Sequence, residues 1–148
     1  MTRLNYFETS PQAMDILLKQ EAYLKQQFKE NIALWELLKL RISQINQCAY
    51  CIDMHSKDAR QYGESIERIL GLSAWPDMPF YTPHEQSALA WAELITSGEL
   101  ITDVHYQEAV AIHGEQGLMD LTIAVNAINS WNRIAKAFKP EVGAYKPA

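Results

Sequence analysis

The sequence contains few cysteines, no cluster of basic residues and no long apolar run, and each shortage excludes a class of protein. Two cysteines in 148 residues cannot build a framework of structural disulfides. The net charge of -5, without a Lys/Arg cluster, argues against a nucleic-acid binder. No apolar run approaches the ~18 residues of a membrane span. The N-terminal MTRLNYFETSP has no apolar signal region. We therefore expect a cytoplasmic protein that binds neither nucleic acid nor membrane.

The alternation of apolar and polar residues that marks half-buried strands is also absent. Apolar residues recur instead at helical spacing, and capping residues precede several of the runs: Ser10, Asn31, Asn46, Thr82 and Thr102. The sequence therefore predicts a single all-α domain over residues 1–148. The expected helices cover residues 11–28, 32–46, 48–62, 66–72, 83–97, 103–113 and 117–138. Helices 32–46 and 117–138 are apolar on most sides, which predicts a buried position, and the tail from about 140 to 148 is expected to be loose.

The two cysteines stand close together at the start of a predicted helix. Cys48 and Cys51 form a Cys-x-x-Cys pair, and His55 follows Cys51 by four residues, one turn along the same helix face. A helix N-terminus stabilises a thiolate, and a histidine one turn away can hold or donate a proton. In a reducing compartment this spacing indicates redox or metal chemistry rather than a structural crosslink.

Glu36 lies in the middle of the apolar helix 32–46, between Trp35 and Leu37. A carboxylate in such surroundings needs a partner or a raised pKa. One interpretation is an ion pair with Lys39, Arg41 or an arginine of another helix. The other is a buried general base that serves the cysteines. Both remain open at the level of the sequence.

Two alternatives to redox chemistry use the same residues. Cys48, Cys51 and His55 are zinc ligand types, and Glu36 would complete four ligands, but no second Cys-x-x-Cys or His-x-x-x-His motif is present. A buried, inert cysteine pair is the other alternative. We predict no bound metal and no cofactor. The remaining histidines are interpreted as surface or capping residues, and three asparagines of the last helix as buried hydrogen-bonding groups: His84, His105, His113, Asn126, Asn129 and Asn132.

The spacing of Glu36, Cys48, Cys51 and His55 resembles the core motif of the AhpD-like alkylhydroperoxidases, which belong to the carboxymuconolactone decarboxylase superfamily. The segments RISQINQCAYCIDMHSKDARQYGE, AWPDMPFYTPHEQSALAWAE and INSWNRIAKAF are similar to segments of that family, so the resemblance covers most of the chain. It implies an all-α AhpD-like bundle with core motif 36–55. It also implies a homo-oligomer: a dimer, a trimer or a hexamer.

The resemblance further implies a peroxidase that uses a Cys48/Cys51 dithiol–disulfide cycle. Cys51 would attack the peroxide, Cys48 would resolve the product, and Glu36 and His55 would relay protons. A dithiol protein or small dithiol would be the reductant. Tyr50 stands where AhpD itself tends to carry a histidine, which indicates a paralogue. A redox sensor without turnover, and a decarboxylase like the superfamily's namesake, are the alternative functions.

Overall fold

The computed structural model describes all residues from 1 to 148, and it contains helices but no strand. The predicted all-α class is therefore confirmed. The helices are α1 (Tyr6–Thr9), α2 (Pro11–Gln27), α3 (Ile32–Ile45), α4 (Ala49–Gln61), α5 (Ile66–Gly71), α6 (Pro83–Ser97) and α7 (Asp103–Phe138), with short 3-10 turns at Lys29–Asn31 and Leu72–Asp77. None of these helices is both long enough and apolar enough to cross a membrane.

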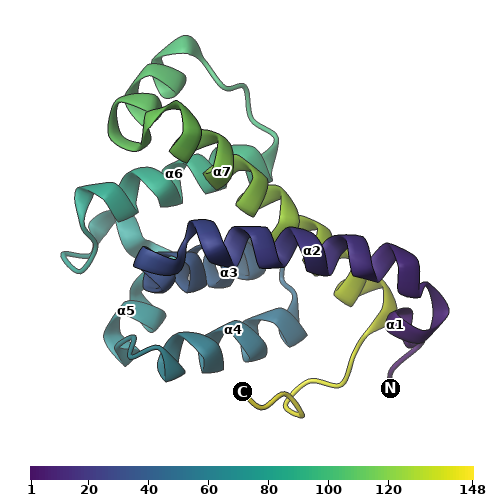
Figure 1. Ribbon diagram of the computed structural model, residues 1–148. Coiled ribbons are helices and arrows are strands. Elements are labelled where there is room, and N and C mark those ends of the chain that lie inside the picture. Colours follow the sequence, from purple (N-terminus) through teal and green to yellow (C-terminus); the bar gives the residue numbers. More distant parts are fainter.

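Helix α3 is the centre of the bundle. It packs against α4 on one side and against α6 and α7 on the other, while α2 crosses α7 (Figure 1). Its side chains Leu37, Leu38, Leu40 and Ile42 are almost completely buried and join α6 and α7 in the main core cluster. The expectation that 32–46 and 117–138 lie in the core is confirmed. A helix that is apolar nearly all round needs neighbours on every side, and α3 has them.

The helix starts follow the capping residues of the sequence. Thr82 and Glu85 form a reciprocal capping box at α6, with Pro83 in the first turn. Thr102 caps α7, and Asn31 caps α3 through its side-chain oxygen. Ser10 precedes Pro11 as expected, but its side chain makes no capping hydrogen bond.

Gly114 divides α7 in the way that the sequence predicts. Its backbone angles, φ 69° and ψ 168°, are not helical and lie in a region that favours glycine. The predicted helices 103–113 and 117–138 are therefore two arms that meet at this residue. The sequence did not indicate α1, and a single-turn helix is too short to show a periodic pattern.

The C-terminal tail differs from the prediction. Residues 140–148 form no helix, but the tail lies along α4 rather than hanging loose (Figure 1). Lys57 donates hydrogen bonds to the carbonyls of Gly143 and Tyr145, and Asp53 accepts one from the Gly143 amide. The expectation rested on composition, which cannot show polar partners that lie nearly ninety residues away in the chain.

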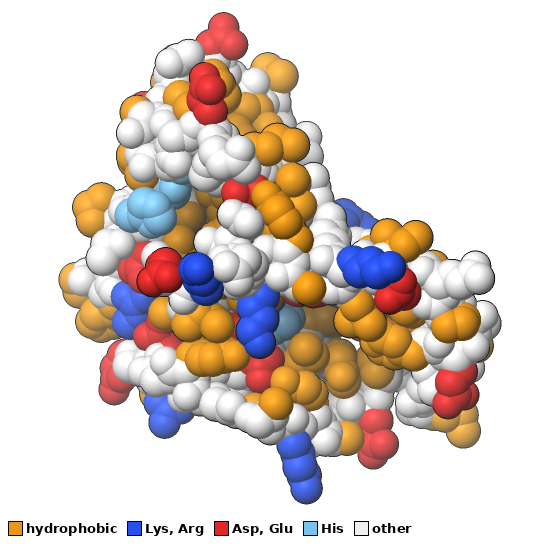
Figure 2. Space-filling view, viewed as in Figure 1, with side chains coloured by type: hydrophobic (Ala, Val, Ile, Leu, Met, Phe, Trp, Pro, Cys, Tyr) orange, Lys and Arg blue, Asp and Glu red, His pale blue; other side chains and the backbone are white.

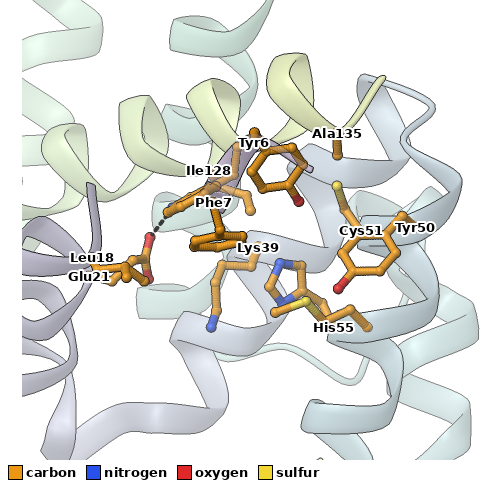
Figure 3. Close-up of a pocket in the computed structure, with 12 residues that line it drawn as sticks. Tyr6, Phe7, Leu18, Glu21, Lys39, Tyr50, Cys51, His55, Ile128 and Ala135 are labelled. Atoms are coloured by element: carbon orange, nitrogen blue, oxygen red, sulfur yellow. Dashed lines mark hydrogen bonds between the residues drawn. The ribbon is translucent and has the colours of Figure 1, made fainter. Parts of the chain in front are cut away.

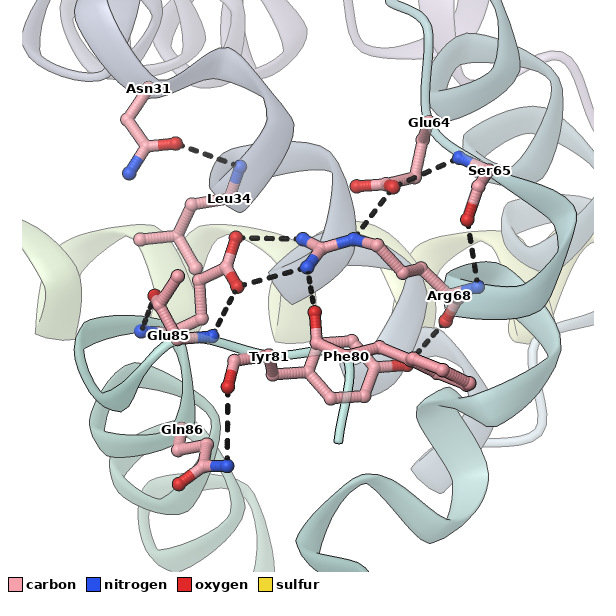
Figure 4. Close-up of polar contacts among 10 residues, drawn as sticks. Asn31, Leu34, Glu64, Ser65, Arg68, Phe80, Tyr81, Glu85 and Gln86 are labelled. Atoms are coloured by element: carbon pink, nitrogen blue, oxygen red, sulfur yellow. Dashed lines mark hydrogen bonds and ion pairs between the residues drawn. The ribbon is translucent and has the colours of Figure 1, made fainter. Parts of the chain in front are cut away.

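A buried ion cluster fixes the connection between α5 and α6 (Figure 4). Arg68 pairs with Glu64 at 2.7 Å and with Glu85 at 2.7 Å. It also donates to the carbonyl of Phe80, while the Tyr81 hydroxyl donates to the carbonyl of Arg68. The guanidinium thus joins the end of α4, α5 and the start of α6. The cluster also holds the segment before α6 against the body, through the Phe80 carbonyl and the Tyr81 hydroxyl.

Candidate active site

The cysteine pair lies at the N-terminus of α4. Cys48 is the N-cap, and its sulfur accepts a hydrogen bond from the Cys51 amide at 3.4 Å. The two cysteines form a disulfide, with their Cα atoms 5.3 Å apart. The sequence favoured Asn46 as the cap, but Asn46 ends α3 and donates to the side-chain oxygens of Asn129 and Asn132. Both sulfurs therefore lie at the positive end of a helix dipole.

Glu36 and His55 face each other across the α3–α4 interface. Glu36 Oε2 lies 3.5 Å from His55 Nδ1, and neither atom has a closer polar partner. The second Glu36 oxygen pairs with Lys39 Nζ at 2.7 Å, one turn along α3. The Lys39 ammonium also lies 3.8 Å from the centre of the Trp35 ring. The ion-pair interpretation of Glu36 is therefore confirmed, with Lys39 as the partner, while its role as a general base stays a prediction.

The electrostatics of this pair follow from burial and from mutual contact. Burial alone would raise the pKa of Glu36, but His55 and the Lys39 ammonium outweigh it and hold the pKa below its ordinary value. Burial lowers the pKa of His55, although the carboxylates of Glu36 and Asp58 act in the opposite direction. The pair thus favours an ionised carboxylate beside a neutral imidazole, a combination that can accept a proton at His55.

A mostly apolar cavity of about 200 Å³ reaches Cys51 and His55. On the face shown in Figure 2, hydrophobic side chains gather round a hollow between α2 and α4. Lys39, His55 and Tyr50 point into the cavity, while the Cys51 sulfur faces Ala135 (Figure 3). Besides Lys39 of α3, the walls come from four other helices: Tyr6 and Phe7 of α1, Leu18 and Glu21 of α2, Met54 of α4, and Ile128 and Trp131 of α7.

A second pocket, of about 540 Å³, reaches Cys48 from another side. Its walls include Lys136 and Lys139 near the end of α7, and Glu141 and Val142 of the tail. Cys48 lines this pocket but not the first, and Cys51 lines the first but not this one. The disulfide therefore lies between two separate approaches.

One group of side chains has the spacing of metal ligands. Donor atoms of Glu36, His55 and Asp58 all lie within 4.8 Å of one another. The zinc site considered from the sequence used Cys48 and Cys51 as ligands instead, but these two sulfurs form a disulfide in the structure. The Lys39 ammonium bonded to Glu36 would repel a divalent cation, so the arrangement fits proton transfer better than metal binding.

All four residues that the sequence singled out lie together: Glu36 and His55 in contact, Cys48 and Cys51 bonded, and all of them buried. Sequence reasoning named Lys39 only as a structural partner, and it missed Asp58 and Tyr145. Asp58 follows His55 by three residues, so helical spacing alone could have placed it beside the site. Of the asparagines, Asn129 and Asn132 are buried and hydrogen-bonded as expected, while Asn126 is exposed.

Comparison with known proteins agrees with this architecture. Residues 33–94 match the model of the carboxymuconolactone decarboxylase family, and this range contains all four candidate site residues. The uncharacterized protein YdfG of Bacillus subtilis is 42% identical over 137 residues, which cover 91% of this chain and 92% of that protein. The uncharacterized protein YnjA of Escherichia coli is 27% identical over 94 residues, 63% of this chain and 52% of that protein.

Two solved structures share the fold. One is a protein of unknown function from Agrobacterium tumefaciens, described as a candidate antioxidant defence protein AhpD. It is 34% identical, with a TM-score of 0.89 over 98% of this chain and all of that one. The other is a peroxidase-related protein with an alkylhydroperoxidase AhpD core from Ralstonia eutropha. It is 18% identical, with a TM-score of 0.76 over 91% of this chain and 74% of that one.

Proposed function

Because the chain belongs to the carboxymuconolactone decarboxylase family, among its AhpD-like members, we propose that it is a thiol-dependent peroxidase. One observation carries the proposal. The Cys48–Cys51 disulfide lies at a helix N-terminus and beside an apolar cavity that also contains His55, the partner of Glu36. A cysteine pair that already forms a disulfide across one helical turn can cycle between dithiol and disulfide with little backbone movement.

In the first half-reaction the Cys51 thiolate attacks the terminal oxygen of a hydroperoxide. A sulfur–oxygen bond forms, the O–O bond breaks, and Cys51 becomes a sulfenic acid. The departing alkoxide takes a proton and leaves as an alcohol. His55 is the proton carrier: its neutral imidazole takes the proton of the Cys51 thiol and passes it to the alkoxide. It lines the cavity with Cys51, and Glu36 orients its ring from the Nδ1 side.

Cys48 then resolves the sulfenic acid. Its sulfur attacks Cys51, the disulfide forms, and water leaves. The hydrogen bond from the Cys51 amide, together with the helix dipole, stabilises the Cys48 thiolate needed for this step. A dithiol must afterwards reduce the disulfide, and the pocket that reaches Cys48 offers it a path that does not cross the peroxide cavity.

The cavity favours an organic hydroperoxide over hydrogen peroxide. Aromatic and aliphatic side chains form most of its wall, and burial of an apolar tail against them contributes about 25 cal/mol per Å². Hydrogen peroxide has no such tail. The volume of about 200 Å³ suits a small aryl or short alkyl group.

The test is consumption of cumene hydroperoxide by the reduced protein with excess dithiothreitol, alongside hydrogen peroxide at equal concentration. We expect turnover of both peroxides, with a higher kcat/KM for cumene hydroperoxide. Consumption of neither peroxide would reject the proposal. If one equivalent of peroxide were consumed to form the disulfide, without further turnover, a redox sensor would become the better account.

A further inference from the structure

The tail places one side chain at the edge of the Glu36–His55 pair. The Tyr145 hydroxyl donates a hydrogen bond to Asp58 Oδ1 at 2.8 Å. Asp58 in turn has a carboxylate oxygen within 4.8 Å of donor atoms of both Glu36 and His55. A chain of polar groups therefore runs from the candidate active site, through α4, to the C-terminal tail.

The backbone on either side of Tyr145 is fixed to the same helix. Lys57 donates to the carbonyl of Tyr145 at 3.0 Å and to that of Gly143 at 3.3 Å. The Gly143 amide donates to Asp53 at 3.1 Å, and Asp53 also pairs with Lys57 at 2.9 Å. Side chains on two successive turns of α4 thus hold the tail segment that contains Tyr145, which is more than a solvated tail requires.

His55 is surrounded by charged and titratable groups from every element near it. On α3 the Glu36 carboxylate faces its Nδ1, and the Lys39 ammonium neutralises the far oxygen of Glu36. The cavity that His55 lines is also lined by Glu21 of α2, Tyr6 of α1, and Tyr50 and Cys51 of α4. On the other side, Asp58 of α4 lies near His55 and is bonded by Tyr145 of the tail. Besides Glu36, Asp58 is the only carboxylate of this set whose oxygen approaches the His55 ring closely enough to join the cluster.

We propose that Asp58 and Tyr145 are positioning residues of the active site, so that the C-terminal tail completes it. The proposal extends the peroxidase function to two further residues. Burial favours the neutral imidazole of His55, and the Asp58 carboxylate offsets part of this effect. Asp58 thereby stabilises the imidazolium that forms when His55 takes the proton of the Cys51 thiol, and this imidazolium stabilises the thiolate. The Tyr145 hydroxyl keeps that carboxylate turned toward the cluster instead of toward water. Tyr145 therefore acts only through Asp58.

The test measures alkylation of reduced Cys51 by iodoacetamide against pH, in a Cys48→Ser background that leaves one thiol. This readout involves no peroxide. We expect Asp58→Asn to raise the pH midpoint by about half a unit to one unit, because loss of one nearby charge removes support for the imidazolium. Tyr145→Phe should raise it in the same direction by less. The double variant should match Asp58→Asn alone, since the second change removes a hydroxyl that no longer positions a charge.

Two control variants separate this role from a structural one. Asp58→Glu keeps the charge and should retain most of the wild-type midpoint. Tyr62→Phe removes a hydroxyl from an exposed tyrosine at the end of the same helix and should change nothing. Unchanged midpoints in Asp58→Asn and Tyr145→Phe, even with a lower melting temperature, would overturn the proposal. Shifted midpoints in a protein that consumes no peroxide would reject the peroxidase function alone and leave the positioning role standing.

Discussion

Glu36 is the residue on which the chemistry of the site depends most. Its carboxylate is 2% exposed and stays ionised because Lys39 and His55 compensate the cost of burial. One oxygen serves Lys39 and the other faces His55. Replacing Glu36 by glutamine keeps the shape of the side chain but removes the charge that orients His55 and supports proton transfer.

We therefore predict that Glu36→Gln slows oxidation of the reduced protein by cumene hydroperoxide. The expected loss is about 10²–10⁴-fold, the usual effect of removing general acid–base support. Single-turnover stopped-flow fluorescence would measure it. The matched control is Glu93→Gln, which alters a partly buried carboxylate that pairs with Arg41 and Trp75 outside the cavity. A Glu36→Gln rate equal to that of the control would contradict the relay.

The residues of the site differ in how far the sequence could reveal them. Cys48, Cys51 and His55 follow from spacing within one helix, and Glu36 follows from its position among apolar neighbours together with the family resemblance. Tyr145 lies 87 residues from Asp58 in the chain, and no local pattern links the two. Contacts made by an irregular tail depend on the assembled fold, so only the structure could reveal this part.

At the scale of the elements, the Arg68 cluster joins three parts of the chain through one partly buried cation. Arg68→Met would leave Glu64 and Glu85 with little compensation, and both residues are 8% exposed. We predict a loss of about 2–4 kcal/mol in the free energy of unfolding. This is slightly below the range for a fully buried pair, because the guanidinium retains some contact with water. Urea denaturation would measure the change.

A neighbouring arginine supplies the control for that prediction. Arg60 donates to the backbone carbonyl of Glu64 but pairs with no carboxylate, and it is exposed. Arg60→Met should cost less than about 1 kcal/mol, as is usual for surface groups. Similar losses for the two arginine variants would show that the ion cluster adds no particular stability to the α5–α6 connection.

The contact between α6 and the first arm of α7 predicts a pH dependence. The rings of His84 and His113 lie 4.5 Å apart, and His113 also bonds Ser87. Burial, with a further contribution from His84, lowers the pKa of His113 to about 4. The unfolded chain therefore binds more protons than the folded one between about pH 6.5 and pH 4, so stability falls as the pH falls through that window.

In His113→Gln the free energy of unfolding should fall less steeply as the pH falls, because glutamine cannot be protonated. Urea denaturation midpoints measured between pH 7 and pH 4 should therefore change less with pH in this variant than in the wild type. The buried His55 contributes with the same sign in both proteins and so does not affect the comparison. Identical slopes would mean that His113 is not held neutral by the fold.

The helices themselves were predicted well, since their signals are local. Capping residues at Asn31, Thr82 and Thr102 and the break at Gly114 give boundaries within a residue or two of those observed. Asn46 was wrong as the cap of α4 because a cysteine is not a usual N-cap. Cys48 takes that position here through its own sulfur.

At the scale of the whole molecule, large apolar side chains remain exposed on several helices. They include Ile16 of α2, Leu70 of α5, Leu100 before α7, and Val104 and Met119 of α7, each more than half exposed. Contact with another chain would remove this apolar surface from water. We predict a homo-oligomer, and light scattering should give an integral multiple of the 16.9 kDa chain mass. A mass of 16.9 kDa at micromolar concentration would exclude it.

The central claim is that Cys51 reacts with the peroxide and Cys48 resolves the product. The most direct measurement treats reduced Cys48→Ser and Cys51→Ser proteins with one equivalent of cumene hydroperoxide, adds dimedone, and identifies the modified residue by mass spectrometry. The account predicts a trapped sulfenic acid on Cys51 in Cys48→Ser, because nothing resolves it, and no rapid reaction in Cys51→Ser. A sulfenic acid on Cys48 in Cys51→Ser, with Cys51 inert in Cys48→Ser, would contradict the account and reverse the roles of the two cysteines.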